Sequence, residues 1–307
     1  MKNLMTLIGF AMVLASCGKA EPAFDMAVYE QQVLEWRAGR LQSLREPQGY
    51  LNQVGLFWLE EGRSYRFGSG PDNDIRFPGN AAPVIGVFEI SADGVRMTAG
   101  ADIDVSSEGQ PVQNILILAD TTEAPVQITH RSFAWTAVKR DGRFAVRVRD
   151  FEHPFVATFG PLPYFDIDPR YRVPAKLRRY DAPKIANVDT VISGLGYHPE
   201  SPGDVEFEID GQTYELEAYT SGDQLFFVFG DATNRDDTYG AGRFLYAAAP
   251  GEDGVTVLDF NQSYSPPCAF NDFSTCPVAS PRNRLPIRIE AGEKYDPALH
   301  YSPDVGH

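Results

Sequence analysis

Residues 205–218 read Val-Glu-Phe-Glu-Ile-Asp-Gly-Gln-Thr-Tyr-Glu-Leu-Glu-Ala, and this stretch decides the fold class. Apolar side chains alternate with glutamates on both sides of Asp210-Gly211, a dipeptide that favours a two-residue hairpin turn. Successive side chains of a strand point to opposite faces, so the pattern predicts a hairpin with one apolar and one acidic face. From Tyr50 onward, short β-branched and aromatic runs recur between Gly, Pro and Asp breaks. We therefore expect a mainly β body, a β-sandwich or barrel-like, as one unit or two β subdomains.

A second alternating strand, residues 144–149, places apolar side chains on one face and Arg147 and Arg149 on the other. Residues 131–179 as a whole hold 11 Lys and Arg against 5 Asp and Glu, in a chain whose formal charge is −15. Pairing with acidic strands such as the one around Glu206 is the first interpretation of this basic segment. An anion-binding surface is the second.

Residues 26–45 carry apolar side chains near helical spacing, at Val33, Leu34, Trp36, Leu41 and Leu44. This spacing predicts one amphipathic helix before the β body. Asp25 is the expected N-cap, and Pro47 and Gly49 are expected to end the segment.

The N-terminus has the order of an export signal: Lys2, an apolar run over residues 4–14, then Ala15 and Ser16 before Cys17. The run is shorter than the roughly 20 residues that span a bilayer. Leu-Ala-Ser-Cys at residues 14–17 resembles the lipobox of bacterial lipoproteins, which implies a lipid-anchored cell-envelope protein, periplasmic or at the outer membrane in a Gram-negative host. An ordinary cleavable signal is the alternative.

The composition of the chain argues against nucleic acids as partners. The formal charge of −15 becomes −16 once the signal, with its single Lys and no acid, is removed. Such a chain repels nucleic acid and anionic lipid surfaces. We therefore expect no nucleic-acid partner, and we expect membrane attachment to depend on the lipid at Cys17.

Residues 65–78 read Tyr-Arg-Phe-Gly-Ser-Gly-Pro-Asp-Asn-Asp-Ile-Arg-Phe-Pro and resemble the opening of a forkhead-associated domain, a β-sandwich that binds phosphothreonine. The likeness covers the strand, the glycine loop and Asn73-Asp74-Ile75. That family has an arginine where this chain has Ser69, and its Ser-Arg-x-x-His signature has no counterpart near Ala81. The resemblance implies the architecture without the phosphopeptide activity.

The C-terminal part resembles the bacterial domain-of-unknown-function 1684 family. The segments that carry this likeness are residues 229–233, 238–245, 258–261, 264–270, 276–277, 283–285 and 290–294, together with the Trp36 helix and residues 55–62. The resemblance covers most of the mature chain and implies no activity.

These observations divide the chain into four parts. Residues 1–17 are the signal peptide with its lipobox cysteine, and residues 18–49 are a tether and the helix. Residues 50–125 are the forkhead-associated-like β region, and residues 126–300 are the C-terminal β domain. The last boundary is drawn at the polar stretch 119–125.

Loop and strand-end positions supply the candidate binding residues, because binding groups on β scaffolds usually sit there. Residues 244–248 and 255–258 are expected to pair as a hairpin around a turn at residues 251–254, which would bring Arg243 beside Asp259. We expect one polar cavity there. The candidate ligand-binding residues are Asp231, Thr238, Tyr239, Arg243, Asp259, Asn261, Tyr264 and Glu293. A structural role for these Asp, Asn and Arg side chains is the competing interpretation.

Cys268 and Cys276 form the only cysteine pair left after lipidation of Cys17, and an oxidising compartment predicts a disulfide between them. No histidine lies at a recognisable spacing from Cys268 for a catalytic thiolate. The sequence predicts no cofactor and no metal site, since two cysteines with seven residues between them match no common zinc pattern.

Three functions remain open. The favoured one is a noncatalytic envelope lipoprotein that binds a small or anionic ligand, or a protein partner, through loops of the β scaffold. The second is a hydrolase with Asp231, Asp259 and Glu293 as acid and base candidates. The third is a purely structural envelope component.

Overall fold

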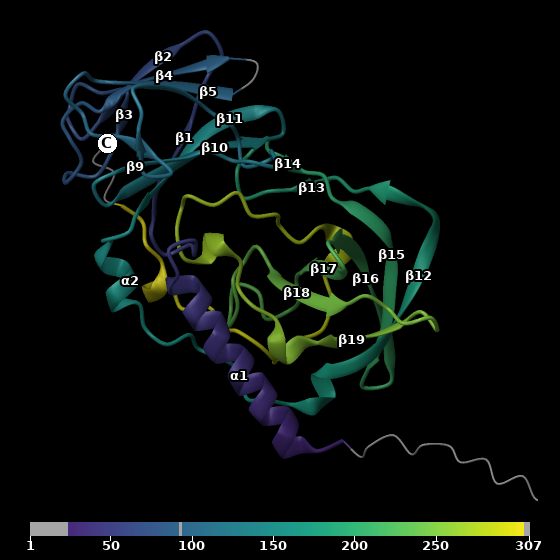
Figure 1. Ribbon diagram of the computed structural model, residues 1–307. Coiled ribbons are helices and arrows are strands. Elements are labelled where there is room, and N and C mark those ends of the chain that lie inside the picture. The colour runs from purple at the N-terminus through teal and green to yellow at the C-terminus, as the bar shows by residue number, and fades with distance from the viewer. Residues whose placement is uncertain (1–23, 92–93, 304–307) are drawn as a thin grey trace, which may run out of the picture.

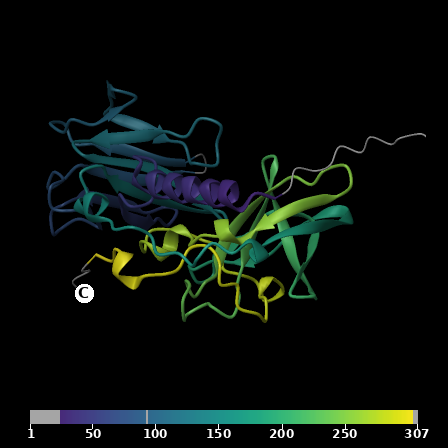
Figure 2. The same ribbon diagram turned by 90° about the horizontal axis from the view of Figure 1, so that it is seen from below.

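The computed structural model describes residues 24–91 and 94–303. It is mainly β, as the sequence predicted, and contains two β bodies and one long N-terminal helix (Figure 1). The first body is a two-sheet sandwich, and the second is a nearly closed barrel-like sheet. The helix runs along the barrel side of the molecule, and its C-terminal end leads toward the sandwich (Figure 1 and Figure 2).

Helix α1 spans Met26–Arg45, the range that the sequence predicted. The Asp25 carboxylate caps it by accepting hydrogen bonds from the backbone N–H groups of Ala27 and Val28, which have no partner inside the helix. The helix buries Tyr29, Val33 and Leu44. Its predicted apolar stripe is incomplete, because the side chain of Leu34 is 47% exposed.

The sandwich consists of a five-stranded and a six-stranded sheet, ordered β3-β2-β4-β5-β8 and β1-β11-β10-β9-β6-β7. Stacked and edge-on rings of Phe67, Phe77, Phe88 and Trp135 fill the space between the sheets. The strand bounds are β1 Gln53–Trp58, β2 Ser64–Gly68, β3 Ile75–Arg76, β4 Gly86–Ser91, β5 Gly94–Ala99, β6 Ser106–Ser107, β7 Gln110–Pro111, β8 Asn114–Ile117, β9 Gln127–His130, β10 Phe133–Arg140 and β11 Arg143–Asp150.

The sandwich extends beyond the boundary expected at residue 125. Strands β9 to β11 lie after that boundary in sequence, yet β11 pairs with β1 from Gln53↔Arg149 to Trp58↔Ala145. Their apolar faces close the same core. The N-terminal β unit therefore runs to Asp150, and the polar stretch 119–125 is a loop within it.

The barrel-like sheet has the order β18-β17-β16-β15-β12-β19. Its outermost strands approach each other, since the Thr256 hydroxyl on β19 donates a hydrogen bond of 2.8 Å to the Ala248 carbonyl on β18. The bounds are β12 Arg172–Ile185, β15 Glu200–Ile209, β16 Gln212–Ser221, β17 Gln224–Phe229, β18 Arg243–Ala248 and β19 Val255–Asp259.

The hairpin that decided the fold class is present as β15 and β16. These strands are antiparallel with Ile209 opposite Gln212, and the turn residues Asp210 and Gly211 have φ angles of 51° and 74°. Val205, Phe207 and Leu216 are buried in the barrel core. On the outer face, the Arg178 guanidinium pairs with Glu206 and Glu215.

The prediction that residues 244–248 and 255–258 pair with each other as a hairpin is wrong. Strand β18 pairs with β17, and β19 pairs with β12, so residues 244–248 and 255–258 lie at opposite ends of the sheet order. The turn between them does form, with the Gly254 N–H bonded to the Gly251 carbonyl at 2.9 Å. Barrel closure brings the two strands together without pairing them.

Short elements connect and cover the two bodies. Strands β13 and β14 form a separate two-stranded sheet, and helix α2 follows the sandwich. Their bounds, with those of the 3-10 turns, are α2 Pro154–Thr158, η1 Pro169–Tyr171, β13 Val188–Asp189, β14 Gly196–Tyr197, η2 Phe260–Gln262, η3 Pro267–Ala269, η4 Pro281–Asn283 and η5 Pro297–Leu299. Among the described residues, no helix has the length and apolar character needed to cross a membrane.

We predict opposite stability effects for one substitution at two glycines. Gly211→Ala places a Cβ at φ +74° and is expected to cost about 1 kcal/mol, because L-residues are strained there. Gly39→Ala, in the interior of α1 with no heavy atom within 4 Å of the new Cβ, is expected to stabilise by up to about 1 kcal/mol. Urea unfolding measures both values. If both substitutions changed the free energy of unfolding in the same direction, the backbone geometry described for these positions would be contradicted.

Candidate functional site

Arg243 and Asp231 form an ion pair that is completely buried. Both side chains are 0% exposed, and Arg243 Nη2 donates to Asp231 Oδ2 at 2.8 Å. The same guanidinium donates to the backbone carbonyls of Ile289, at 2.9 Å, and Ala291. Two buried charges avoid a large desolvation penalty only when they compensate each other and are hydrogen-bonded. Arg243 is therefore part of the barrel interior rather than of an open pocket.

The second carboxylate oxygen of Asp231 organises the loop that follows β17. It accepts hydrogen bonds from the Thr233 N–H at 2.8 Å, the Thr233 hydroxyl at 2.6 Å and the Ile289 N–H at 3.3 Å. Thr238 lies in the same network, 2.8 Å from the Thr233 hydroxyl and 2.9 Å from Asn234 Nδ2. Asp231 and Thr238 thus serve the loop structure.

Asp259 and Asn261 join the barrel to helix α1. The Tyr29 hydroxyl donates to Asp259 Oδ1 at 2.8 Å and accepts from Asn261 Nδ2 at 2.9 Å. Asn261 also exchanges two hydrogen bonds with the backbone of Asp168. Burial raises the pKa of Asp259, and burial together with the negative charge of Asp259 raises the pKa of Tyr29.

The single polar cavity expected around Arg243 and Asp259 does not form. Arg243 pairs with Asp231, whereas Asp259 pairs with Tyr29. The expectation depended on a paired hairpin of β18 and β19, which the barrel replaces with two separate ladders. The sequence-predicted residues are distributed over the Asp231 loop (Asp231, Thr238, Tyr239 and Arg243), the helix contact (Asp259 and Asn261) and a third place (Tyr264 and Glu293).

This third place centres on Glu293, which is fully buried. Its carboxylate accepts from the Ser265 N–H at 3.1 Å and from Arg40 Nε at 3.3 Å. Burial raises the pKa of Glu293, whereas Arg40 and Ser265 lower it. The Arg40 guanidinium lies 4.5 Å from the centroid of the Tyr264 ring and also donates to the Ser265 carbonyl. Helix α1 thereby supplies the cation that compensates Glu293.

A cavity of about 400 Å³ opens above this pair, between α1 and β18. We call it the aromatic groove; its lining residues are Trp36, Gly39, Arg40, Ser43, Tyr246 and Tyr264. The Trp36 and Tyr246 rings lie 6.2 and 6.5 Å from the Tyr264 ring, and the two tyrosines are nearly parallel at 13°. Sequence reasoning had named Tyr264 and Glu293 but missed Arg40 and Tyr246. The signal for Arg40 was its place four residues after Trp36, on the same helix face.

The two cysteines are next to each other but not bonded. The predicted disulfide is absent from the structure, in which Cys268 and Cys276 are free and buried. The Cys268 N–H lies 3.2 Å from Cys276 Sγ. The neighbouring Cys276 thiol and burial raise the pKa of Cys268, which disfavours a reactive thiolate. Tyr239 lies beside this pair, with its ring 5.1 Å from that of Tyr295.

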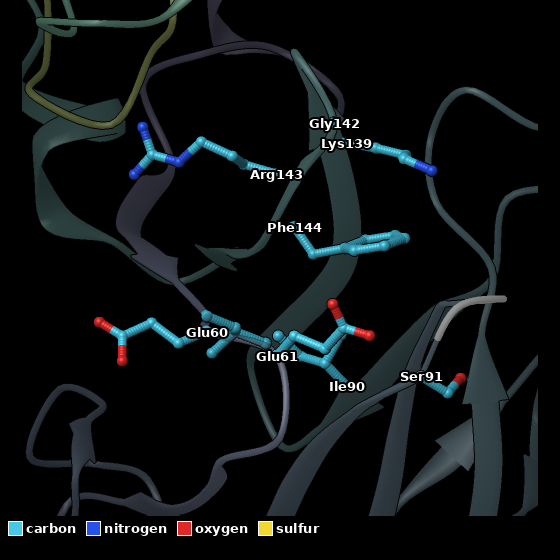
Figure 3. Close-up of a pocket in the computed structure, with 9 residues that line it drawn as sticks. Glu60, Glu61, Ile90, Ser91, Lys139, Gly142, Arg143 and Phe144 are labelled. Atoms are coloured by element: carbon cyan, nitrogen blue, oxygen red, sulfur yellow. The ribbon is translucent and has the colours of Figure 1, made fainter.

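A further cavity, of about 550 Å³, lies on the sandwich away from all the predicted residues. Figure 3 shows the Phe144 ring across its middle, with Lys139 extending to one side and Arg143 and Glu60 to the other. The Glu61 carboxylate lies below the Phe144 ring, whereas Lys139 and Arg143 point in opposite directions, so the two cations do not converge on one ligand. Among residues 24–91 and 94–303, no cluster of three or more His, Cys, Asp or Glu side chains could hold a metal ion.

Comparison with known proteins locates the part of the chain that has relatives. Residues 157–294 match the family described as Protein of unknown function (DUF1684). This DUF1684 segment contains the barrel, Arg243 and Glu293, and it excludes α1 with Trp36 and Arg40. No curated protein matches the chain. A solution NMR structure of an uncharacterized protein of Haloarcula marismortui is similar at 28% identity, over 49% of this chain and 80% of that one, with a TM-score of 0.38.

We predict that Arg243→Leu destabilises the protein by about 3–5 kcal/mol, because it leaves the Asp231 carboxylate buried without a cation. Arg282→Leu is the matched control. Arg282 also pairs with a carboxylate, that of Asp204 at 2.8 Å, but its side chain is 55% exposed, so about 0–1 kcal/mol is expected. Urea unfolding followed by circular dichroism compares the variants. If both variants lost the same free energy of unfolding, burial would not determine how much the Arg243–Asp231 pair stabilises the protein.

Proposed function

We propose that this protein is a noncatalytic, lipid-anchored component of the cell envelope that binds a small ligand with a flat apolar face in the aromatic groove. The observation that carries the proposal is the open groove itself. Trp36, Tyr246 and Tyr264 present three rings to one cavity, and Tyr246 is 41% exposed. Aromatic faces bind flat partners through offset or edge contacts of about 0.5–1.5 kcal/mol beyond area burial.

The polar floor of the groove supports binding by a preformed site. Arg40 is fixed by Glu293, by the Ser265 carbonyl and by the ring of Tyr264. Ligand pockets commonly combine apolar walls with a few polar groups held in place before binding. Such a groove pays little conformational entropy when the ligand enters.

The positions of the carboxylates favour binding over hydrolysis. Asp231, Asp259 and Glu293 are engaged by three different partners, namely Arg243, Tyr29 and Arg40. Paired acid and base groups must face one substrate. A purely structural role does not explain why aromatic rings line an open groove. We therefore favour ligand binding over a purely structural role.

Envelope anchoring is proposed from the sequence, because Cys17 lies outside the described residues. The short link between Cys17 and the start of α1 at Met26 supports a tether that keeps α1, and with it the groove, close to the membrane. The same oxidising compartment is the reason that a Cys268–Cys276 disulfide stays a prediction for the exported protein.

We propose that the sandwich is a forkhead-associated-like scaffold without phosphothreonine binding. The residues of the resemblance act within the fold: the Ser69 hydroxyl donates to the Ala81 carbonyl, and Asn73 Nδ2 donates to the carbonyls of Gly70 and Pro83. These bonds close the glycine loop. A loop whose polar side chains bond its own backbone supports a structural role.

We predict that Cys17→Ser releases the protein from the membrane, because one or more acyl chains are then missing. Cell fractionation and electrophoretic mobility measure the outcome. Cys268→Ser is the control and is expected to stay in the membrane fraction. Unchanged fractionation of Cys17→Ser would remove the anchor from the proposal.

We predict that the groove binds N-phenyl-1-naphthylamine, a flat, neutral fluorescent probe, and that Tyr246→Ser weakens this binding about fivefold. That factor corresponds to the loss of about 1 kcal/mol of ring contact. The polypeptide starting at Gly18, which contains every described residue, is titrated with the probe.

Phe151→Ser is the matched control for this titration, since Phe151 is an aromatic residue of the sandwich with the same 41% exposure as Tyr246. It is expected to leave probe affinity unchanged. Equal affinities for all three proteins, or no saturable binding to the wild type, would contradict a ligand site in the groove.

A further inference from the structure

Three arginines on strands β10 and β11 differ in how their charge is compensated. Arg140 forms two hydrogen bonds with the Asp120 carboxylate, at 2.8 and 2.6 Å. Arg149 donates to Asn52 Oδ1 at 2.8 Å and to the Gly49 carbonyl. Arg147 lies between them in space and has no carboxylate within salt-bridge distance in the described part of the chain, where its buried Nε also lacks any hydrogen-bond partner.

The Arg147 side chain lines a cavity of about 180 Å³ between the sandwich and the C-terminal part of the chain. The opposite wall is residues 274–277, which are held against the sandwich by the Asn271 Nδ2 bond to the Tyr50 carbonyl and the Ser274 hydroxyl bond to Gln53. Tyr50, Ser274 and Thr275 are among the other lining residues, and the Ser274 hydroxyl is directed at Gln53 Oε1 and Asn271 Oδ1. The partly buried Arg147 and the hydroxyl-bearing residues Tyr50 and Thr275 thus line one small space.

We infer that this cavity, called here the Arg147 cavity, is a binding site for a small oxyanion of phosphate size. Because Asp120 already neutralises Arg140, the charge of Arg147 is the uncompensated one in the cavity. A partly buried charge without an ionic partner is energetically unfavourable, and an anion that binds beside it offsets part of that cost. The guanidinium fork matches oxyanions by forming two parallel hydrogen bonds.

The size and the electrostatics of the cavity limit the ligand. About 180 Å³ holds a phosphate or sulfate ion with a few waters but not a nucleotide. Burial and the positive charge of Arg140 lower the pKa of Arg147, whereas the nearby Asp120 carboxylate, which pairs with Arg140, raises it. The site is independent of the aromatic groove, since the two share no lining residue.

The test is the thermal stability of the polypeptide starting at Gly18 in increasing inorganic phosphate, with sodium chloride at matched ionic strength as the reference. Saturable binding to the native state raises Tm. We expect a rise of about 2 °C or more beyond that in chloride, and calorimetric titration with phosphate at one site. Sulfate and acetate, titrated separately, tell a tetrahedral oxyanion from a carboxylate.

Arg147→Met is expected to abolish the phosphate-dependent rise in Tm and to keep or increase Tm in chloride, because it removes an uncompensated buried charge. Arg143→Met, on the same strand but exposed, is the control and is expected to keep the phosphate response. If Arg147→Met does not fold, Thr275→Val replaces it, with a weaker phosphate response expected.

An equal phosphate response of the wild type and the Arg147 variant, or no wild-type response beyond that in chloride, would overturn the site. A wild-type response to acetate alone would replace phosphate by a carboxylate ligand and overturn the assignment to a tetrahedral oxyanion. Probe binding in the aromatic groove is measured on the same samples, so the failure of one site is distinguishable from the failure of the other.

Discussion

The buried pair of Arg243 and Asp231 determines how the last part of the chain packs. Inside the barrel, the Arg243 guanidinium donates through its Nη atoms to the Asp231 carboxylate and the carbonyls of Ile289 and Ala291, whereas its Nε has no hydrogen-bond partner among the described residues. The backbone is thereby fixed two residues before Glu293. That position brings the Glu293 carboxylate under the Ser265 N–H and within reach of Arg40. The floor of the aromatic groove is thus set by an ion pair whose two side chains are fully buried.

Helix α1 supplies the residues of the aromatic groove that the barrel domain lacks. Tyr29, near its start, bonds Asp259 and Asn261, and Arg40, three turns later, bonds Glu293. Two polar contacts on one helix face fix both its position and its rotation. Trp36 lies between them and is therefore directed at Tyr264. Because the family match begins at residue 157, the groove combines a barrel that has relatives with a helix from outside the matched segment.

Features that depend on neighbouring residues were predictable, and features that depend on distant partners were not. The alternation around Asp210-Gly211 and the cap at Asp25 gave the right hairpin and helix, since each is decided within a few residues. The boundary at residue 125 was wrong because β11 returns to pair with β1, about ninety residues earlier in the chain. The partner of Arg243 was missed for the same reason: barrel closure, which no local pattern encodes, decides which carboxylate a buried arginine meets.

Two arginines of the basic segment at residues 131–179, Arg178 and Arg147, lie in different environments although they share one sequence pattern. Arg178 lies on the solvent face of the barrel and pairs with Glu206 and Glu215 across neighbouring strands, as expected for a charged outer face. Arg147 has the same alternation in sequence but faces the C-terminal part of the chain, where it is partly buried and forms no ion pair with a described carboxylate. The place of each arginine in the fold, rather than the sequence pattern, separates the two interpretations, because Arg178 meets acids on neighbouring strands, whereas Arg147 lines a cavity that can admit an anion.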